Sequence, residues 1–320
     1  MIVVAGEALV DLVPSPSAAD GQLADLMPRL GGGPYNVAIA AGRLGAPVSF
    51  LSRVSTDLYG DALVERLHGS DVRTDLVQRG DEPTTLAVVG IGSDGSARYS
   101  FYVEGTADRL VIDPGALADD VRAVSFGTLS LVLEPGASAY EEVLRREAAR
   151  GALTVLDPNI RAALIHDPAA YRARYASWLP HVGLLKVSVE DARWLADLPA
   201  DAPEDTVLEV AREWKAAGPA AIVLTRGGDG LAVLAGDGEV LRVPPRKVTV
   251  VDTIGAGDTV QGALIAWLHQ NDALNVAAVG ALNSEKWAEA LTYAGNAAAF
   301  TCTRAGAEPP YTHELKAFLS

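Results

Sequence analysis

The feature that most limits how this chain can fold is a regular alternation between short apolar runs and longer segments of helix-forming residues. The apolar runs lie at residues 2–5, 48–54, 121–126, 153–156, 183–187 and 220–224. Runs of this length are typical of buried strands. Strands that alternate with helices across short loops favour a mostly parallel central sheet with helices on both faces. We therefore predict an α/β fold of this kind.

Two segments depart from this alternation, and each is predicted to be a β-hairpin. Residues 85–91 and 98–103 are rich in apolar side chains and flank residues 93–96, where an Asp-Gly pair favours a tight turn. A second pair of runs flanks residues 236–238 in the same way. Because the first hairpin interrupts the strand–helix pattern, it is a candidate flap or small β-lid. Residues 14–30 are expected to be irregular or to lie at a sheet edge.

Polar or glycine-rich clusters follow the ends of several predicted strands. In open α/β sheets the carboxyl ends of the strands share one edge, and ligands bind there. The clusters are Asp11, residues 31–36, residues 157–161, residues 225–230 and residues 252–258. We expect them to converge. Taken singly, each also has a structural explanation, such as a solvated loop acid for Asp11.

The stretch from Val248 to Gly262 combines a predicted anion site with a carboxylate. Its β-branched start, residues 248–251, predicts a strand. Gly255-Ala256-Gly257 predicts a turn of small residues that leads into a helix beginning near Asp258. Free amides at a helix start attract an anion. A carboxylate beside a transferring phosphoryl group is placed to take a proton from the attacking hydroxyl. The alternative is a simple connection in which Asp258 is an N-cap.

Three other polar positions have both a functional and a structural interpretation. Asn36 offers a donor and an acceptor to a polyol, or it belongs to an ordinary helix start. Arg161 suits a phosphate or carboxylate, or it forms a surface salt bridge. Ser188, with Asp191 three residues later, resembles a helix-capping pair, which explains both residues without a ligand.

Composition excludes several classes of partner. The formal net charge is −15, from 41 acidic and 26 basic residues, which argues against a nucleic acid or an anionic membrane as the main partner. The one cysteine, Cys302, can form no intrachain disulfide and fits a reducing compartment. The N-terminal run contains Glu7 and Asp11 and is predicted to be a strand rather than a signal peptide. Charged residues, Gly or Pro interrupt every apolar run before it reaches the length of a membrane span.

Sequence motifs exclude several familiar kinds of active site. The chain has no P-loop motif, no complete dinucleotide-binding glycine motif and no protein-kinase motif. Its five histidines lack metal-ligand spacing, and no serine or cysteine nucleophile motif is present. An anion site at a helix start with a neighbouring carboxylate remains, and this suits transfer of a phosphoryl group to an alcohol.

Three motifs resemble those of the ribokinase-like (PfkB) carbohydrate kinases. Residues 251–258, VDTIGAGD, resemble the C-terminal signature of that family, and residues 31–38, GGGPYNVA, resemble its N-terminal glycine signature. Residues 225–230, TRGGDG, resemble its nucleotide-binding turn. The resemblance extends from residue 1 to about Gly306. It implies a Rossmann-like core with a small β-lid, ATP as the donor and Mg²⁺ carried with the ATP.

The resemblance also implies a role for individual residues. Asp258 would be the catalytic base, the amides of Gly255, Ala256 and Gly257 would bind the transferring phosphoryl group, and Arg161 would reach that group or the sugar. The sugar-binding positions would be Asp11, Gly32, Gly33, Asn36, Arg161 and Asp258. The nucleotide side would include Lys186, Ser188, Thr225, Gly227, Gly230, Gly257 and Asn296. Asp191 or Glu190 would serve Mg²⁺, and Asp252 would serve a monovalent cation such as K⁺.

Two segments, residues 157–161 and residues 105–108, are most similar to those of fructokinases. The expected activity is an ATP-dependent fructokinase, with 2-keto-3-deoxygluconate kinase, ribokinase and nucleoside kinase as alternatives. A non-catalytic sugar-binding regulatory protein is an alternative of another class. The chain departs from the family where Asp191 replaces a glutamate and where Thr259 and Val260 follow the base.

We expect one kinase domain over residues 1–320, with the lid built from about residues 12–30 and 84–103. Apolar residues of the lid hairpin, Leu86, Val88, Ile91 and Phe101, suggest a homodimer that forms through the lid. The expected partners are a small sugar and ATP, with no nucleic acid and no membrane. The expected location is the cytoplasm.

Overall fold

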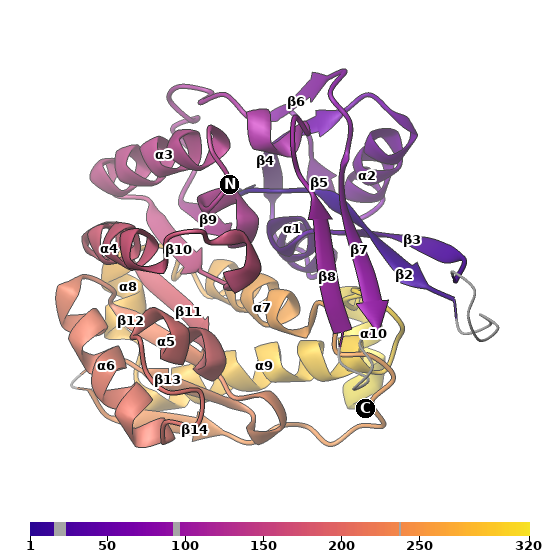
Figure 1. Cartoon of the computed structure of the whole chain (residues 1–320). Coiled ribbons are helices and arrows are strands. Elements are labelled where there is room, and N and C mark those ends of the chain that lie inside the picture. The colour runs from indigo at the N-terminus through magenta and orange to yellow at the C-terminus, as the bar shows by residue number, and fades with distance from the viewer. Residues whose placement is uncertain (16–23, 92–96, 237) are drawn as a thin grey trace.

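The computed structural model describes residues 1–15, 24–91, 97–236 and 238–320 (Figure 1). The helices are α1 (Gly33–Arg43), α2 (Leu58–His68), α3 (Gly136–Arg150), α4 (Pro168–Trp178), α5 (Val189–Leu195), α6 (Glu204–Ala217), α7 (Ala256–Gln270), α8 (Val276–Ala281), α9 (Ser284–Cys302) and α10 (Thr312–Leu319). The strands β1 to β7 are Ile2–Ala5, Leu9–Pro14, Leu26–Gly31, Val48–Ser55, Val72–Arg73, Val77–Gly80 and Thr85–Ile91. The strands β8 to β14 are Ala97–Tyr102, Ala123–Gly127, Leu153–Asp157, Leu184–Ser188, Ala221–Thr225, Leu231–Leu234 and Val240–Val243.

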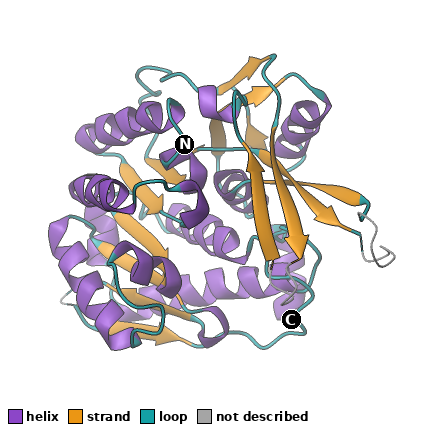
Figure 2. Ribbon diagram, viewed as in Figure 1, coloured by secondary structure: helices purple, strands orange, loops and turns teal. Residues whose placement is uncertain are grey.

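The larger sheet has ten strands in the order β14-β13-β12-β11-β10-β9-β1-β4-β5, and β6 also pairs with β4. All neighbours from β12 to β6 run parallel, and only β13 and β14 join in antiparallel fashion. Strand and helix alternate along most of the chain, so the carboxyl ends of the parallel strands lie at one edge of the sheet (Figure 2). This confirms the predicted α/β fold with a mostly parallel sheet.

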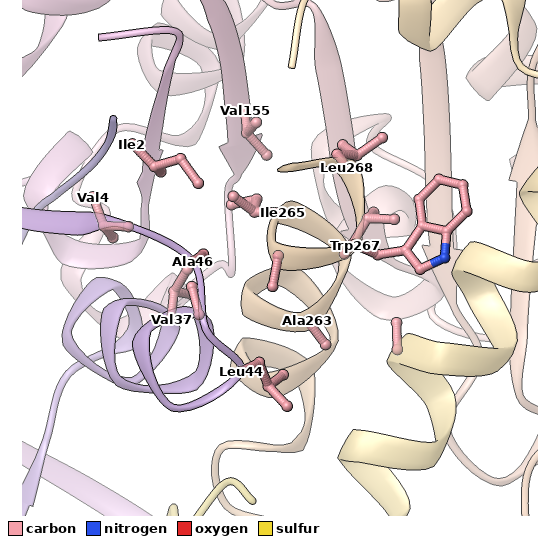
Figure 3. Packing of buried hydrophobic residues seen from close by; sticks show 14 of the residues in the cluster. Ile2, Val4, Val37, Leu44, Ala46, Val155, Ala263, Ile265, Trp267 and Leu268 are labelled. Carbon is pink, nitrogen blue, oxygen red and sulfur yellow. The ribbon is translucent and has the colours of Figure 1, made fainter. Parts of the chain in front are cut away.

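Helices cover both faces of this sheet, because successive strand residues point to opposite sides. Ile2 and Val4 of β1 belong to one apolar cluster, with residues from α1, α2, α7 and α9. Val3 and Ala5 belong to the other cluster, with residues from α3, α4, α5 and α6. Figure 3 shows the first cluster, where α1 and α7 lie side by side on the strands. The fully apolar strands are thus explained by burial on both faces.

A second sheet of four strands projects from the larger one (Figure 1). Its order is β3-β2-β7-β8, with β2 antiparallel to β3 and β7 antiparallel to β8. Strand β2 follows β1 after only three residues, and α1 begins two residues after β3 ends. Both connections reach the carboxyl end of β1, so the second sheet stands beside the edge where the polar clusters were expected. The turn predicted at residues 93–96 lies outside the described residues.

One expectation about local structure was wrong, and another was confirmed in part. Residues 248–251 form no strand, and Val250 and Val251 are 58% and 62% exposed. β14 ends at Val243, and the prolines at 244 and 245 that follow it cannot donate to a strand ladder. Residues 14–30 were expected to be irregular or to lie at a sheet edge, and Leu26–Gly31 is an edge strand, β3, of the second sheet.

Helices α1 and α7 approach closely because Gly262 has no side chain. A Cβ atom at Gly262 would lie 2.6 Å from Ala40 Cβ and 2.7 Å from the Val37 carbonyl oxygen. Glycine lowers helix propensity at this position by about 1 kcal/mol relative to alanine. The close contact of the two helices offsets this cost. Within the part of the chain that the structure describes, no helix has both the length and the apolar composition to cross a membrane.

Candidate active site

A polar cavity of about 330 Å³ lies between the carboxyl edge of the larger sheet and the second sheet. Six residues that the sequence assigned to sugar binding line it together: Asp11, Gly32, Gly33, Asn36, Arg161 and Asp258. They come from β2, the β3–α1 junction, the first turn of α1, the segment after β10, and α7. Segments far apart in sequence therefore converge as the parallel topology predicts. We call this space the polar cavity.

Asp258 occupies the first turn of α7 rather than the N-cap position. Gly255 is the N-cap, with φ 75° in the left-handed region, which favours glycine. The N-cap interpretation of Asp258 was therefore wrong, and the carboxylate does not bind its own helix start. It is 8% exposed and accepts a hydrogen bond of 2.9 Å from Asn36 Nδ2 of α1. Asn36 Oδ1 is buried and has no protein partner, so it can accept from a ligand hydroxyl.

Burial raises the pKa of Asp258 to about 6. The Asn36 hydrogen bond and the positive charges of Lys186 and Arg161 act in the opposite direction. Asp11 faces the same cavity, and burial also raises the pKa of this carboxyl to about 6, with Arg161 opposing the shift. Neither carboxylate is therefore tightly neutralised by a cation, and both can accept from hydroxyl groups near neutral pH.

Lys186 and Asp157 form a buried ion pair under the helix start. Lys186 Nζ lies 2.6 Å from Asp157 Oδ2, and both side chains are 5% exposed. Burial opposes the charge of Lys186, but Asp157 outweighs this and raises the lysine pKa. A Cβ atom at Gly257 would lie 3.1 Å from Lys186 Nζ. The ammonium group therefore lies beside the first turn of α7, and it lines the polar cavity rather than the nucleotide side to which the sequence assigned it.

Arg161 is held close to the backbone of its own loop. Its guanidinium donates to Asn159 Oδ1 at 2.8 Å and to the Asn159 carbonyl at 3.1 Å. Asn159 has φ 40°, and its Nδ2 donates to Thr128 Oγ1 at 3.2 Å. The segment after β10 is thus fixed against the turn after β9. Arg161 belongs to the polar cavity and makes none of the surface salt bridges found among the described residues.

A second and larger cavity of about 470 Å³ lies on the other side of the α7 start. Residues that the sequence assigned to a nucleotide line it: Thr225, Gly227, Gly230, Gly257 and Asn296. Its walls are otherwise largely apolar, with Val243, Val250 and Leu291 among them. We call this space the apolar cavity. Ser188 is not part of either lining and instead caps α5, where its hydroxyl accepts from the Asp191 amide at 2.9 Å.

The two cavities meet at the start of α7. Gly257 and Thr253 line both of them, Gly255 and Asp258 line only the polar cavity, and Ala256 lines only the apolar one. The Ala256 amide donates to the Thr253 carbonyl at 3.2 Å. Among the hydrogen bonds of the described residues, none uses the amides of Gly255 or Gly257. These two amides at a helix start can therefore bind an anion that lies between the cavities.

Three acids were candidates for cation binding, and the structure separates them. Asp191 Oδ1 accepts from the Ile160 amide at 3.1 Å, and burial raises the Asp191 pKa to about 6, with Asp157 adding to the shift. Glu190 is exposed at the rim of the apolar cavity. Asp252 accepts from the Ile254 amide at 3.0 Å and from the Gly306 amide at 2.8 Å. The described residues contain no cluster of three or more metal-binding side chains.

Sequence reasoning missed several residues of the polar cavity. Glu7, Leu9, Thr128 and Leu129 line it, although none was assigned to a site. Glu7 had a signal, because a buried acid directly after an apolar strand needs a partner. Thr128 had none. Its φ of 58° is rare outside glycine, and only the fold shows that it follows the strand beside β1.

Comparison with known proteins agrees with this geometry. The family model described as pfkB family carbohydrate kinase matches residues 1–314. The chain belongs to this family. It is 36% identical over 287 residues to a fructokinase of Rhizobium leguminosarum bv. trifolii, which covers 89% of this chain and 85% of the relative. It is 30% identical over 321 residues to fructokinase-1 of Oryza sativa subsp. japonica, which covers 99% of this chain and 96% of the relative.

Solved structures show the same relationship for this pfkB family member. A fructokinase from Xylella fastidiosa with bound ATP has a TM-score of 0.86 and 26% identity, with 99% of this chain and 97% of that chain covered. A fructokinase from Vibrio cholerae O395 shares the fold at a TM-score of 0.83 and 22% identity, with 100% and 98% covered. The chain is thus a carbohydrate kinase, a phosphotransferase whose acceptor is a sugar hydroxyl.

Replacement of Asp258 by asparagine is expected to stabilise the protein at high pH. The folded-state pKa of about 6 exceeds the ordinary aspartate value of 3.8, so the protonated carboxyl contributes stability that is complete below about pH 4. This stability is lost as the pH rises through 6. Asparagine cannot ionise and still accepts from Asn36. We expect Asp258→Asn to unfold at a higher temperature than the parent at about pH 8, with the difference vanishing near about pH 4.

Thermal unfolding followed by circular dichroism at both pH values measures this effect. Glu213→Gln, which changes an exposed acid on α6, is the control and should leave the unfolding temperature unchanged at both. A lower unfolding temperature for Asp258→Asn at about pH 8 would show that burial does not dominate the energetics of this carboxylate.

Proposed function

We propose that this chain is an ATP-dependent fructokinase. The observation that carries the proposal is that the polar and apolar cavities meet at Gly257, with Asp258 on the polar side. A sugar in the polar cavity and a nucleotide in the apolar cavity would place a hydroxyl and a phosphoryl group on either side of the α7 start. The similar fructokinase of Xylella fastidiosa was solved with bound ATP, which supports ATP as the donor. The second sheet, β2, β3, β7 and β8, would act as a lid within a single kinase domain.

The proposed reaction uses one base and one anion site. Asp258 takes the proton of a sugar hydroxyl as that oxygen forms a bond to the terminal phosphorus of ATP, and the bond from this phosphorus to the ADP oxygen breaks. The amides of Gly255 and Gly257 stabilise the charge on the transferring group. The Ala256 amide, bonded to Thr253, contributes less than the sequence suggested. Lys186 and Arg161 add positive charge on the side of the polar cavity, where Arg161 also orients the sugar or phosphoryl oxygens.

Fructose fits the polar cavity as a compact polyol. The cavity offers carboxylate oxygens from Asp11 and Asp258 and the unpartnered amide oxygen of Asn36 as acceptors for hydroxyl groups. Gly32 and Gly33 let the backbone approach the ligand. The relatives at 36% and 30% identity are fructokinases, which favours fructose over 2-keto-3-deoxygluconate, ribose or a nucleoside. A non-catalytic sugar-binding role is disfavoured because Asp258 and its free neighbouring amides are both present.

A sugar panel tests the proposal directly. Release of ADP from ATP is measured with fructose, 2-keto-3-deoxygluconate, ribose and adenosine as acceptors. We expect fructose to give the highest kcat/KM. In Asp258→Asn the kcat should fall by about 10²–10⁴-fold, because the base is lost while the binding groups stay.

The outcomes of this panel are distinct. If no acceptor stimulates ADP release and Asp258→Asn changes nothing, the chain is not a kinase for these sugars. If another acceptor exceeds fructose in kcat/KM, the kinase assignment holds and the proposed specificity is wrong. Binding of fructose to both forms, measured by calorimetry, separates a folded but inactive variant from one that no longer binds sugar.

We propose that Asp191 rather than Glu190 serves Mg²⁺. Mg²⁺ in kinase sites keeps several waters and uses one or two carboxylates together with substrate phosphates, so no full protein cage is required. Asp191 lies next to Asp157 and Lys186 beneath the helix start, whereas Glu190 is exposed. Asp252 is proposed to serve a monovalent cation. A double mutant of the Vibrio cholerae fructokinase was solved with potassium bound, which supports use of such a cation. When bound, Mg²⁺ would neutralise charge on the phosphates.

Two matched variants distinguish the acids. Asp191→Asn is expected to raise the Mg²⁺ concentration for half-maximal activity by about tenfold, and Glu190→Gln should leave it unchanged. Activity is titrated with Mg²⁺ at constant free ATP, with and without K⁺, so that the two cation requirements are measured separately. An effect confined to Glu190→Gln would reverse the assignment.

We also propose that two copies of the chain form a homodimer through the lid. The proposed location is a reducing compartment such as the cytoplasm. Leu26 and Met27 of β3 and Tyr102 of β8 are 44%, 37% and 62% exposed, and both strands are edges of the lid sheet. Exposed apolar groups beside unpaired strand edges suit a second copy of the chain. One cysteine, which can form no intrachain disulfide, fits the proposed compartment, and cell fractionation would check it.

Sedimentation velocity checks the assembly. The parent chain is expected to sediment as a dimer and Tyr102→Glu as a monomer, since a buried unpaired charge would oppose association. Ile112→Glu is the control, because Ile112 is 65% exposed and lies outside the lid. A monomeric parent, or equal dissociation by both variants, would contradict a lid interface.

A further inference from the structure

Glu7 lies where the larger sheet joins the lid, and the proposed chemistry does not use it. It falls between β1 and β2, in the three-residue connection from the central strand to the first lid strand. The residue is 2% exposed and lines the polar cavity. A buried acid in such a connection requires hydrogen-bond partners, because burial of an unpaired polar group is costly.

The carboxylate of Glu7 binds two backbone segments at once. Glu7 Oε1 accepts from the Gly33 amide at 3.1 Å, and Glu7 Oε2 accepts from the Ser130 amide at 3.1 Å. Gly33 begins α1 directly after the lid strand β3. Ser130 lies in the 3-10 turn Thr128–Leu131 that follows β9. The side chain therefore connects the segment where the lid joins the larger sheet, called here the lid root, with the 3-10 turn that follows β9.

These two segments form adjoining parts of the polar-cavity wall, because a Cβ atom at Gly33 would collide with Thr128 Oγ1. Gly32 and Gly33 line the cavity from the lid side, and Thr128 and Leu129 line it from the core side. The main chain of Glu7 contributes as well, since a Cβ atom at Gly32 would lie 2.7 Å from the Glu7 carbonyl oxygen. Gly32 has φ 112°, which is accessible to glycine. The position of the wall thus depends on Glu7 through both its side chain and its backbone.

Other acids at the lid root have a different role. Asp108 accepts from Thr85 Oγ1 at 2.5 Å, and Asp57 accepts from the Thr84 amide at 2.9 Å. Both bonds hold the start of β7, and neither acid lines the polar cavity. Burial raises the pKa of Glu7 to about 8, with the charge of Asp108 adding to the shift and the two amides opposing it. Both oxygens can accept from the amides whether or not the carboxyl is protonated.

We propose that Glu7 is a positioning residue that sets the sugar-binding wall by holding the Gly33 and Ser130 amides at a fixed separation. The inference rests on the proposed function, because it assigns the polar cavity to the sugar. Glu7 acts through the backbone and not on the reacting atoms, so it should control sugar affinity rather than the transfer step. The nucleotide side, beyond Gly257, should be unaffected.

Glu7→Gln tests this with little change in shape. A glutamine offers one carbonyl oxygen, and its NH₂ group faces the second amide as a donor, so one of the two bonds is lost. We expect the KM for fructose, and its Kd by calorimetry without ATP, to rise by about tenfold, while kcat and the KM for ATP stay within about twofold. Glu7→Asp, too short to reach both amides, should shift the same constants in the same direction.

Glu147→Gln is the matched control. Glu147 is fully buried on α3 and pairs with Arg150, away from both cavities. Its replacement should lower the unfolding temperature without a change in either KM. If Glu7→Gln leaves the fructose KM unchanged, lowers kcat alone, or behaves as Glu147→Gln does, the inference is overturned. If the parent enzyme phosphorylates none of the panel sugars, the proposed function itself fails, which is a different result.

Discussion

The close packing of α1 against α7 is the contact on which the site depends. Gly262 allows it, since any larger residue would meet Ala40 and the Val37 carbonyl. The same approach lets Asn36 of α1 reach Asp258 of α7, 222 positions away in sequence. Because α1 starts near the end of β3, this contact also fixes the base of the second sheet relative to the helix start that faces both cavities. One helix pair therefore aligns the proposed base, the proposed sugar-binding wall and the proposed anion site.

In and around the polar cavity, carboxylates outnumber the positively charged side chains. Asp11, Asp157, Asp191 and Asp258 lie near Lys186 and Arg161, and three of these four carboxyls have a pKa raised to about 6 by burial. A ligand that donates hydroxyl hydrogens to Asp11 and Asp258 would favour their ionised forms. Binding of a polyol would thereby restore part of the solvation that the carboxylates lose on burial. This explains how Asp258, the proposed base, can be buried and remain able to take a proton.

The sequence predicted what depends on local pattern and failed where a contact between distant segments decides the outcome. Strand–helix alternation indicated the sheet, and the position of polar clusters at strand ends indicated which residues would converge, as the lining of the polar cavity shows. The β-branched residues 248–251 misled, because two prolines precede them and no neighbouring strand pairs with them. The alternative interpretation of Asp258 as the helix N-cap was wrong, since nothing local showed that Gly255 would take that position. Glu7 could be suspected but not assigned, because its partners are amides 26 and 123 positions away.

A chain with a net charge of −15 must still bind a polyanion if it uses ATP, and the structure indicates how. The lining of the apolar cavity contains one acid, Glu190, and one base, Arg246, whose guanidinium donates to the Phe318 carbonyl. Side-chain cations in that cavity therefore cannot supply most of the attraction. The available positive potential comes from backbone amides at the start of α7 and from Lys186 behind Gly257. Fixed amides need no reorganisation when charge develops on a transferring group, whereas flexible cations do. The field that opposes the net charge is thus confined to the junction of the two cavities, where the reacting groups would meet.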